Sequence, residues 1–407
     1  MKALIDNQTL REQSRVSSWG NLTFLLLDWV CVFLVVAIAL AFEWGRRTWG
    51  ISWLWTVSVW MPCGIVIGCL QHRIGLMGHE ASHNLLVKNR VLNDVLAELF
   101  CFFPMFASIV QYRTKHLAHH LYPNDPDKDP NLGNGKARRL YAKFPMPKGE
   151  FIYQYYLKFF WPPFVLANLM DLIDVISIGS GLGSVPDKPA KSGKSRRFAS
   201  LLGVVYLLVL VAALRTSETI GFPVVYTLGM CWVGAFLVWL ILPEGAFFQG
   251  ARLNFPIKIG GLMRFSYNTL LLGALGLFHQ KTGIDPTLAF LMLWIFPLIY
   301  VFPYLMLLRE VFQHANAGRG KLDNSRIIFT DCFTRWALLG YGNDFHLIHH
   351  LYPNVPQYNL RCLHRQISDE SEEYRQSVEE DHGIHRSSDG RHLAVLDALA
   401  ASSPEEA

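Results

Sequence analysis

Residues 287–308 read TLAFLMLWIFPLIYVFPYLMLL and contain no Asp, Glu, Lys or Arg. A helix of about 20 apolar residues is long enough to cross the hydrocarbon core of a bilayer, which is about 30 Å thick. This stretch therefore predicts a membrane-spanning helix, and it indicates an integral membrane protein rather than a globular one.

Comparable apolar stretches lie elsewhere in the chain. Residues 51–70 and 220–242 are also uncharged, and residues 22–42 carry a single acidic side chain. Residues 198–214 are uncharged but shorter, and residues 265–278 are marginal in length. Hydrophobic residues make up 51% of the chain and charged residues only 17%. We therefore predict an all-α integral membrane protein with a bundle of four to six transmembrane helices.

Polarity divides the chain into three parts. Residues 1–21 form a polar N-terminal leader, and residues 22–365 form the membrane domain. Residues 366–407 are polar and acidic, so we expect a partly disordered cytosolic tail. Within it, only HLAVLDALA, residues 392–400, has an apolar pattern that can pack.

Basic residues concentrate in the long loops. The segment 113–148 carries eight Lys or Arg residues, and the segment 188–197 carries five more. The positive-inside rule places such loops, together with the amino terminus, in the cytoplasm. The formal net charge of +5 is thus expected to act at the membrane surface.

Two nearly identical eleven-residue stretches stand out. HLAHHLYPNDP at 116–126 and HLIHHLYPNVP at 346–356 differ at two positions. On a helix, residues i, i+3 and i+4 share one face. His116, His119 and His120 should therefore lie together, and so should the corresponding histidines of the second stretch, which are His346, His349 and His350.

A third cluster is HEASH, residues 79–83. His79 and His83 are spaced i, i+4, as in zinc proteases, where the intervening glutamate is the general base. The same residues also fit a looser pattern, H-x-x-x-H. Taken alone, the stretch leaves both interpretations open.

The clusters can meet only if the chain returns to one side of the membrane between them. Residues 95–112 are apolar but interrupted by Glu98 and Pro104. We therefore expect this segment to dip into the bilayer and return, or to lie on its surface. An even number of crossings must then separate the second cluster from the third. The clusters would converge in a histidine-rich di-metal cap at the cytoplasmic mouth of the bundle.

A ninth histidine belongs with these clusters. His314 lies six residues beyond residue 308, so a continuing helix would set it about 9 Å past that point. Glu310, at i−4, is placed to support its ring. Asn343 precedes His346 by three residues and is expected either to face the metals, directly or through water, or to form a turn.

The predicted metal ligands are therefore nine: His79, His83, His116, His119, His120, His314, His346, His349 and His350. A zinc ion takes about three or four protein ligands, so this set suits two metals. Imidazole binds zinc, copper, iron and nickel alike, so the ligands alone do not identify the metal.

With these motifs in order, the chain resembles the integral-membrane fatty acid desaturase and hydroxylase superfamily. The three histidine boxes of that superfamily match HEASH, HLAHH and HLIHH, and its additional histidine and asparagine match His314 and Asn343. The resemblance covers roughly residues 20–365. It implies two non-haem iron ions, molecular oxygen as co-substrate and two electrons from an external donor.

The resemblance implies an oxygen-dependent fatty acyl desaturase in the lipid bilayer. Its electron donor would be a separate ferredoxin or cytochrome, and no nucleic acid is expected as a partner. Glu80 is then a residue that supports the ligands rather than a protease base. The same site would also serve a hydroxylase, a carotenoid ketolase or a fatty acid decarboxylase that forms terminal alkenes. A membrane zinc protease and a metal transporter are the alternatives from other classes.

Overall fold

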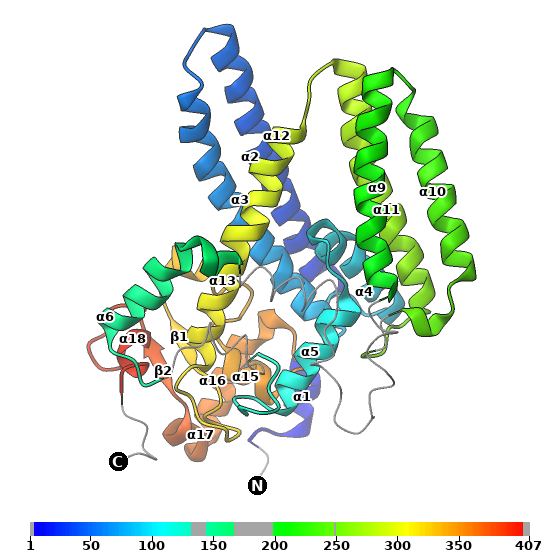
Figure 1. Cartoon of the computed structure of the whole chain (residues 1–407). Helices are drawn as coiled ribbons and strands as arrows, with labels where there is room; N and C mark the ends of the chain where they lie inside the picture. The colour runs from blue at the N-terminus through cyan, green and yellow to red at the C-terminus, as the bar shows by residue number, and fades with distance from the viewer. Residues whose placement is uncertain (1–3, 132–143, 167–197, 248–249, 402–407) are drawn as a thin grey trace.

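The computed structural model describes residues 4–131, 144–166, 198–247 and 250–401. In this part of the chain nearly all regular structure is helical. Two groups of long helices rise from a lower region that contains the short elements and both described chain ends (Figure 1). The expected all-α architecture is confirmed.

In the part of the chain that the structure describes, five helices are long and apolar enough to cross a membrane. They are Trp19–Thr48 in α2 (Ser18–Thr48), α3 (Leu54–Ser82), Leu201–Ile220 in α9 (Phe198–Ile220), α10 (Val224–Ile241), and Thr287–His314, which joins α12 (Thr287–Phe290), η9 (Leu291–Ile295) and α13 (Phe296–His314). A bent pair of helices raises the number to six if it counts as one span. The predicted range of four to six is therefore confirmed.

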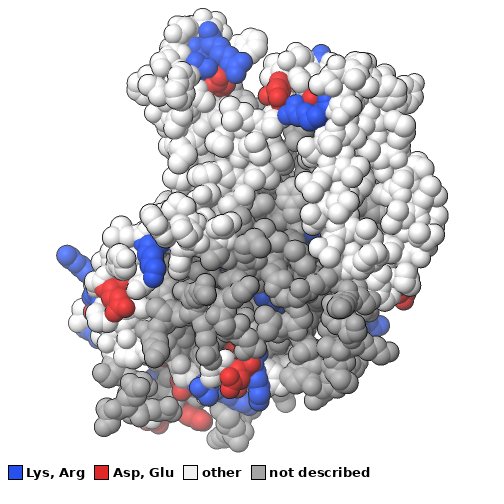
Figure 2. All heavy atoms as spheres, viewed as in Figure 1, with Lys and Arg blue, Asp and Glu red and all other residues white. Residues whose placement is uncertain are grey.

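Charged residues mark the ends of the long helices. Figure 2 shows that the described surface of the upper helices is almost free of charge between their tips and the lower region. At one tip Glu43 pairs with Arg46 and Arg47, and at the other Arg215 pairs with Glu218 and Asp285. The uncharged belt between tips and lower region is the surface that lipid would cover.

Two glycines let α3 pack closely against the last span. A Cβ atom on Gly68 would lie 2.3 Å from Cβ of Val301, and one on Gly64 would lie 3.5 Å from the ring of Pro297. Only a residue without a side chain permits this approach at position 68. Because both helices run to the lower region, their close packing brings His79 and His314 to the same depth.

The segment 95–112 turns back, as expected. Arg90–Met105 and Ile109–Leu121 form a pair bent by 96°, built from α4 (Arg90–Ala97), η1 (Glu98–Phe102), η2 (Phe103–Met105) and α5 (Ile109–Leu121). The buried Glu98 carboxylate accepts hydrogen bonds from Ser108 Oγ at 2.9 Å and from the Ile109 amide at 3.2 Å. These bonds satisfy the start of α5 and hold the bend closed.

A second group of helices stands beside the first (Figure 1). α11 (Ile257–Thr282) packs with α9 and α10, and Gly273 lies directly against Leu228 of α10. α11 is not among the five helices apolar enough to span. Together with the last span, α9, α10 and α11 are four long helices between the second and third histidine boxes in the described part of the chain. Three of the four are candidate spans, so the even number of crossings stays a prediction.

The lower region is built from short elements. They are α1 (Asn7–Gln13), α6 (Lys148–Phe151), η4 (Ile152–Leu157), η5 (Lys158–Phe160), η8 (Glu244–Ala246), β1 (Ile327–Phe329), α14 (Cys332–Ala337), α15 (His346–Leu351), η10 (Gln357–Asn359), α16 (Leu360–Glu370), α17 (Glu372–Ser377), β2 (Glu380–His382) and α18 (Val395–Ala398). β1 and β2 pair in parallel, with Ile328 opposite Asp381.

The C-terminal segment is more ordered than its composition predicts. Residues 366–401 contain parts of four elements, and β2 completes the sheet with β1. Val395, Leu396 and Leu399 are buried against Val311 and Phe312 of α13, so HLAVLDALA packs as expected. Residues 402–407 lie outside the described part. Ordered structure therefore extends well beyond HLAVLDALA. The division of the chain into a leader, a membrane domain and a tail at residues 21 and 365 stays a prediction.

Candidate metal centre

The structure brings all nine predicted histidines together in the lower region. They form two groups, each with one ring nitrogen per residue within 4.8 Å of the others. The first group is His79, His83, His116, His120 and His349, and the second is His119, His314, His346 and His350. Side chains from α3, α5, α13 and α15 thus meet at one place.

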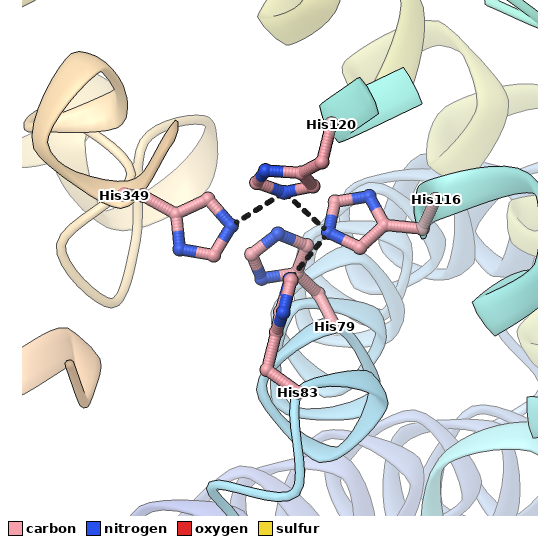
Figure 3. Close-up of side chains that lie close together, drawn as sticks. All are labelled: His79, His83, His116, His120 and His349. Carbon is pink, nitrogen blue, oxygen red and sulfur yellow. Dashed lines mark hydrogen bonds between the residues drawn. The ribbon is translucent and has the colours of Figure 1, made fainter. Parts of the chain in front are cut away.

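In the first group the rings point toward a common centre (Figure 3). His116 Nε2 lies 2.7 Å from His83 Nε2 and 3.0 Å from His120 Nε2. His120 Nε2 lies 3.1 Å from His349 Nε2. His79 completes the group from α3, with its ring centroid 4.4 Å from those of His116 and His349.

The second group has the same organisation. His314 Nε2 lies 3.2 Å from His119 Nε2 and 2.9 Å from His346 Nε2. His350 Nε2 lies 3.2 Å from His346 Nε2. The Nε2 atoms therefore converge here too, while the Nδ1 atoms face outward.

The two H-x-x-H-H boxes contribute to both groups in a reciprocal way. His116 and His120 belong to the first group, whereas His119 belongs to the second. In the third box His346 and His350 belong to the second group, and His349 belongs to the first. Residues i and i+4 share one direction on a helix, and residue i+3 points beside it. Each box therefore reaches both groups.

The arrangement of the ring nitrogens in the second group fits a cation. His119 Nδ1 lies 2.9 Å from Asp129 Oδ2, and His314 Nδ1 lies 2.9 Å from the Asn324 carbonyl oxygen. Both Nδ1 atoms must donate to these acceptors, so a neutral ring has its lone pair on Nε2. With both rings neutral, two such lone pairs 3.2 Å apart would repel each other. A bound cation removes this repulsion, and the donor set therefore fits metal ions.

Burial keeps the imidazoles of the third box neutral. It lowers the pKa of His346, His349 and His350 well below the usual 6.5, because desolvation disfavours the imidazolium. Burial also lowers the pKa of His83, to about 3. Neutral imidazole is the form that binds metals, so these side chains are ready to coordinate at neutral pH.

Asp129 is a supporting residue that the sequence did not reveal. Both of its carboxylate oxygens lie within 3.0 Å of His119 Nδ1, and its side chain is buried. Asp129 Oδ2 also accepts a hydrogen bond from the Asn124 amide at 2.9 Å, which fixes the carboxylate in the loop after the second box. A carboxylate behind a ligating histidine orients the ring and raises its basicity.

Glu80 connects two histidine boxes. Its Oε2 accepts a hydrogen bond from the Gln357 amide at 3.0 Å, and its Oε1 lies 3.6 Å from His79 Nδ1. Gln357 follows the third box closely in sequence. Glu80 thus lies beside the ring of His79, and its role in supporting the ligand set stays a prediction.

The structure gives Glu310 different surroundings from those expected, whereas Asn343 makes the hydrogen bond of a turn residue, one of its two expected roles. The ring of His314 binds the Asn324 carbonyl, whereas Glu310 Oε1 lies 3.9 Å from His119 Nε2 and accepts from Asn131 at 2.5 Å. Asn343 donates from Nδ2 to the Gly340 carbonyl at 3.0 Å, as a turn residue does. Its Oδ1 is buried without a hydrogen-bond partner among the described residues.

Comparison with known proteins agrees with this geometry. The model of the fatty acid desaturase family matches residues 54–260 and 246–381. A dihydrorhizobitoxine desaturase from Bradyrhizobium elkanii is 35% identical over 112 residues, which are 27% of this chain and 29% of that protein. A Delta 8-(E)-sphingolipid desaturase from Emericella nidulans is 25% identical over 84 residues, 20% of this chain and 15% of that protein.

These alignments span less than a third of either relative. The family match, in contrast, extends over most of the chain and includes every histidine of both groups. Several apolar helices and this match make the protein a multi-pass membrane protein. The chain belongs to the fatty acid desaturase family.

Proposed function

We propose that the protein is an oxygen-dependent fatty acyl desaturase whose two histidine groups hold two iron ions. The observation that carries this proposal is the division of nine buried or half-buried imidazoles into groups of five and four with converging Nε2 atoms. Four or five nitrogen donors per metal leave room for oxygen. The family of the chain favours iron over the other metals that imidazole binds.

The iron pair would supply the oxidation of an unactivated C–H bond with molecular oxygen and two external electrons. The residues of the chain position the histidine rings. Asp129 and the Asn324 carbonyl hold the rings of His119 and His314 with Nε2 facing inward. Glu80 ties the first box to the loop after the third.

The site also keeps water away from the reacting groups. His79, His119 and His349 are at most 3% exposed. A water-excluded pocket protects a strong oxidant from side reactions and lets the protein fix one carbon of the substrate beside it. Both effects depend on the close packing of α3 against α13.

We further propose that the histidine groups face the cytoplasm. The basic segments 113–148 and 188–197 support this orientation. The electron donor would be a separate ferredoxin or cytochrome, whose acidic surface the basic segments would attract.

A hydroxylase, carotenoid ketolase or terminal-alkene-forming decarboxylase would use the same site, so the product decides among them. The names of the two relatives refer to different substrates, dihydrorhizobitoxine and sphingolipid, and both names end in desaturase. This agreement favours desaturation here. A zinc protease built on HEASH would leave unused the second group, which contains neither His79 nor His83.

The test is product analysis in cells that express the intact chain or its His349→Ala variant. Gas chromatography with mass spectrometry of lipids and headspace should show a new double bond with the intact chain only. Electron donors are co-expressed in both cultures. A hydroxylated, ketolated or shortened product would show that the protein catalyses the corresponding reaction instead of desaturation. Equal lipid composition in both cultures would contradict an acyl oxidase.

A further inference from the structure

A second cluster of metal-binding side chains lies in the C-terminal segment. Glu380, His382 and His392 each offer one ligand atom, and these atoms lie within 4.8 Å of one another. Glu380 and His382 alternate along β2, so both project from the same face of the strand. None of the three belongs to the histidine groups described above.

The backbone returns to bring His392 beside His382. The His382 amide donates to the Leu393 carbonyl at 2.8 Å, and the Val395 amide donates to the Gly383 carbonyl at 3.0 Å. The two imidazole rings stack with centroids 4.2 Å apart and an angle of 14° between their planes. Residues 382 and 392 thus close a loop whose base is held by backbone hydrogen bonds.

Asp389 faces the Nδ1 edge of both rings. Its Oδ2 forms a hydrogen bond of 2.6 Å with His392 Nδ1 and lies 3.2 Å from His382 Nδ1. A carboxylate accepts only, so a neutral His392 ring keeps its lone pair on Nε2, and the same carboxylate beside His382 Nδ1 favours that tautomer there. Because the rings are nearly parallel and held at one edge, both Nε2 atoms project from the opposite edge.

The lone pair on His382 Nε2 receives no hydrogen bond from the described residues, and this nitrogen is buried. An unpaired buried nitrogen is costly unless something binds it. Glu380 Oε1 lies 3.4 Å from His364 Nε2, and one oxygen of this carboxylate lies within 4.8 Å of the ligand nitrogens of His382 and His392.

We propose that Glu380, His382 and His392 bind a zinc ion. Two imidazoles and one carboxylate are a common zinc ligand set, with water in the fourth position. Asp389 completes the arrangement, because histidine ligands usually donate their other N–H to a carboxylate. The site is independent of the iron centre and of the proposed oxidation.

The zinc would act as a structural clip. It joins β2 to the loop that leads into α18, whose Val395 and Leu396 are buried against Val311 and Phe312 of α13. Val311 and Phe312 come shortly before His314 in α13. Cross-linking a loop restricts the unfolded chain, and a bound metal adds its binding free energy to folding.

The test is the metal content of the purified full chain by inductively coupled plasma mass spectrometry. The protein is saturated with zinc and then desalted. We expect about one zinc per chain in addition to iron. His392→Ala should lose this zinc and keep its iron. The His392 side chain is 45% exposed, so its replacement leaves the buried packing unchanged.

Two further variants make the assignment specific. Asp389→Asn should weaken zinc binding about 10- to 100-fold, because an amide no longer accepts from both rings. His385→Ala is the matched control, since its ring contacts the Tyr156 hydroxyl at 3.2 Å and lies outside the cluster. It should retain zinc.

The zinc proposal is overturned if the intact chain and His392→Ala retain equal zinc. It is also overturned if His385→Ala loses as much zinc as His392→Ala. Loss of iron alone, with zinc retained, would contradict the proposed di-iron centre and leave the zinc site standing. The unfolding temperature with and without zinc provides a second readout, and zinc should raise it in the intact chain only.

Discussion

The Nε2 atoms of His119 and His314 lie 3.2 Å apart, although the two residues are separated by 195 positions in the chain. Both Nδ1 atoms are engaged with acceptors, so both lone pairs face the same point. This contact joins the second histidine box to the end of the last membrane span. It fixes the four-histidine group on which the second iron of the proposed centre depends.

Replacing Asp129 with asparagine should weaken the second metal position. The amide can donate to His119 Nδ1 and so no longer fixes the tautomer with the lone pair on Nε2. Loss of such a supporting partner typically costs about 10- to 100-fold in metal affinity or activity. Iron content and product yield measure the effect.

Asp127→Asn is the matched control for this change, because Asp127 lies in the same loop and is exposed. It should keep normal iron. Equal iron content and yield in Asp129→Asn and Asp127→Asn would remove Asp129 from the support of the metal centre.

Adding a side chain at Gly68 should separate α3 from α13. A Cβ atom there would lie 2.3 Å from Val301, so Gly68→Leu must displace one of the two helices. Overpacking of this kind typically costs about 1–3 kcal/mol. Thermal unfolding in detergent should show a lower transition temperature and reduced iron retention.

Gly229→Leu on α10 provides the comparison, because nothing lies within 4 Å of a Cβ atom at that position. This variant should unfold like the unmodified chain. A Gly68→Leu protein as stable as Gly229→Leu would show that the close approach of α3 and α13 is absent.

Glu98→Gln should destabilise the turn between η1 and α5. The Glu98 carboxylate accepts from Ser108 Oγ and from the Ile109 amide. An amide side chain retains one acceptor and leaves one of these buried donors unpaired, which costs about 1–3 kcal/mol. Glu150→Gln at an exposed position is the control. Equal unfolding temperatures would contradict the role of Glu98.

Iron retention should resist mild acid. Burial lowers the pKa of His83 to about 3 and lowers that of His349 well below 6.5. Protons therefore compete poorly for these nitrogens until the pH falls far below the usual titration range of histidine, whereas they compete for exposed histidines from about pH 6.5 downward. Iron measured after desalting at a series of pH values tests this. Half-release at about pH 6.5 would show that the ligands are exposed.

The lowered pKa of His83 also predicts how the stability of the metal-free protein depends on pH. The folded-state pKa of His83 lies below the unfolded value of 6.5, so the contribution of the neutral ring is fully present above pH 6.5. It is lost as the pH falls toward about 3. Metal-free protein should therefore become progressively less stable across this window.

Much of the helical bundle follows from the sequence. Uncharged stretches such as 51–70 and 287–308 predicted spans, because twenty apolar residues have no other stable environment than lipid or a large core. Glu98 and Pro104 predicted the return of segment 95–112, and the structure adds the physical reason, two hydrogen bonds to the Glu98 carboxylate.

The spacing of the histidines in the sequence identified them as candidate ligands. It did not predict how they divide between the two groups. Helical geometry predicts that His116, His119 and His120 lie on one face, but the direction of each ring depends on where the partner helices stand. His119 joins one group and His120 the other because their ring nitrogens meet histidines of different helices, His314 of α13 and His349 of α15. The role of these residues as iron ligands stays a prediction.

Tertiary contacts determine what the sequence could not reveal. Asp129 is one of several acidic residues in the stretch PNDPDKD and has no local feature that distinguishes it. The C-terminal segment is polar, yet its few apolar side chains pack because α13 and β1 offer them a partner surface. The composition of the segment contains no information about this partner surface, so it did not predict that the segment is ordered.

The most direct test of the central claim is the iron content of the purified full chain, measured with Mössbauer spectroscopy of protein grown on ⁵⁷Fe. Two histidine groups predict about two iron ions per chain in nitrogen-rich coordination, and loss of iron in both His83→Ala and His350→Ala. One zinc ion in place of iron at the nine histidines, or iron content unchanged in both variants, would contradict the di-iron centre.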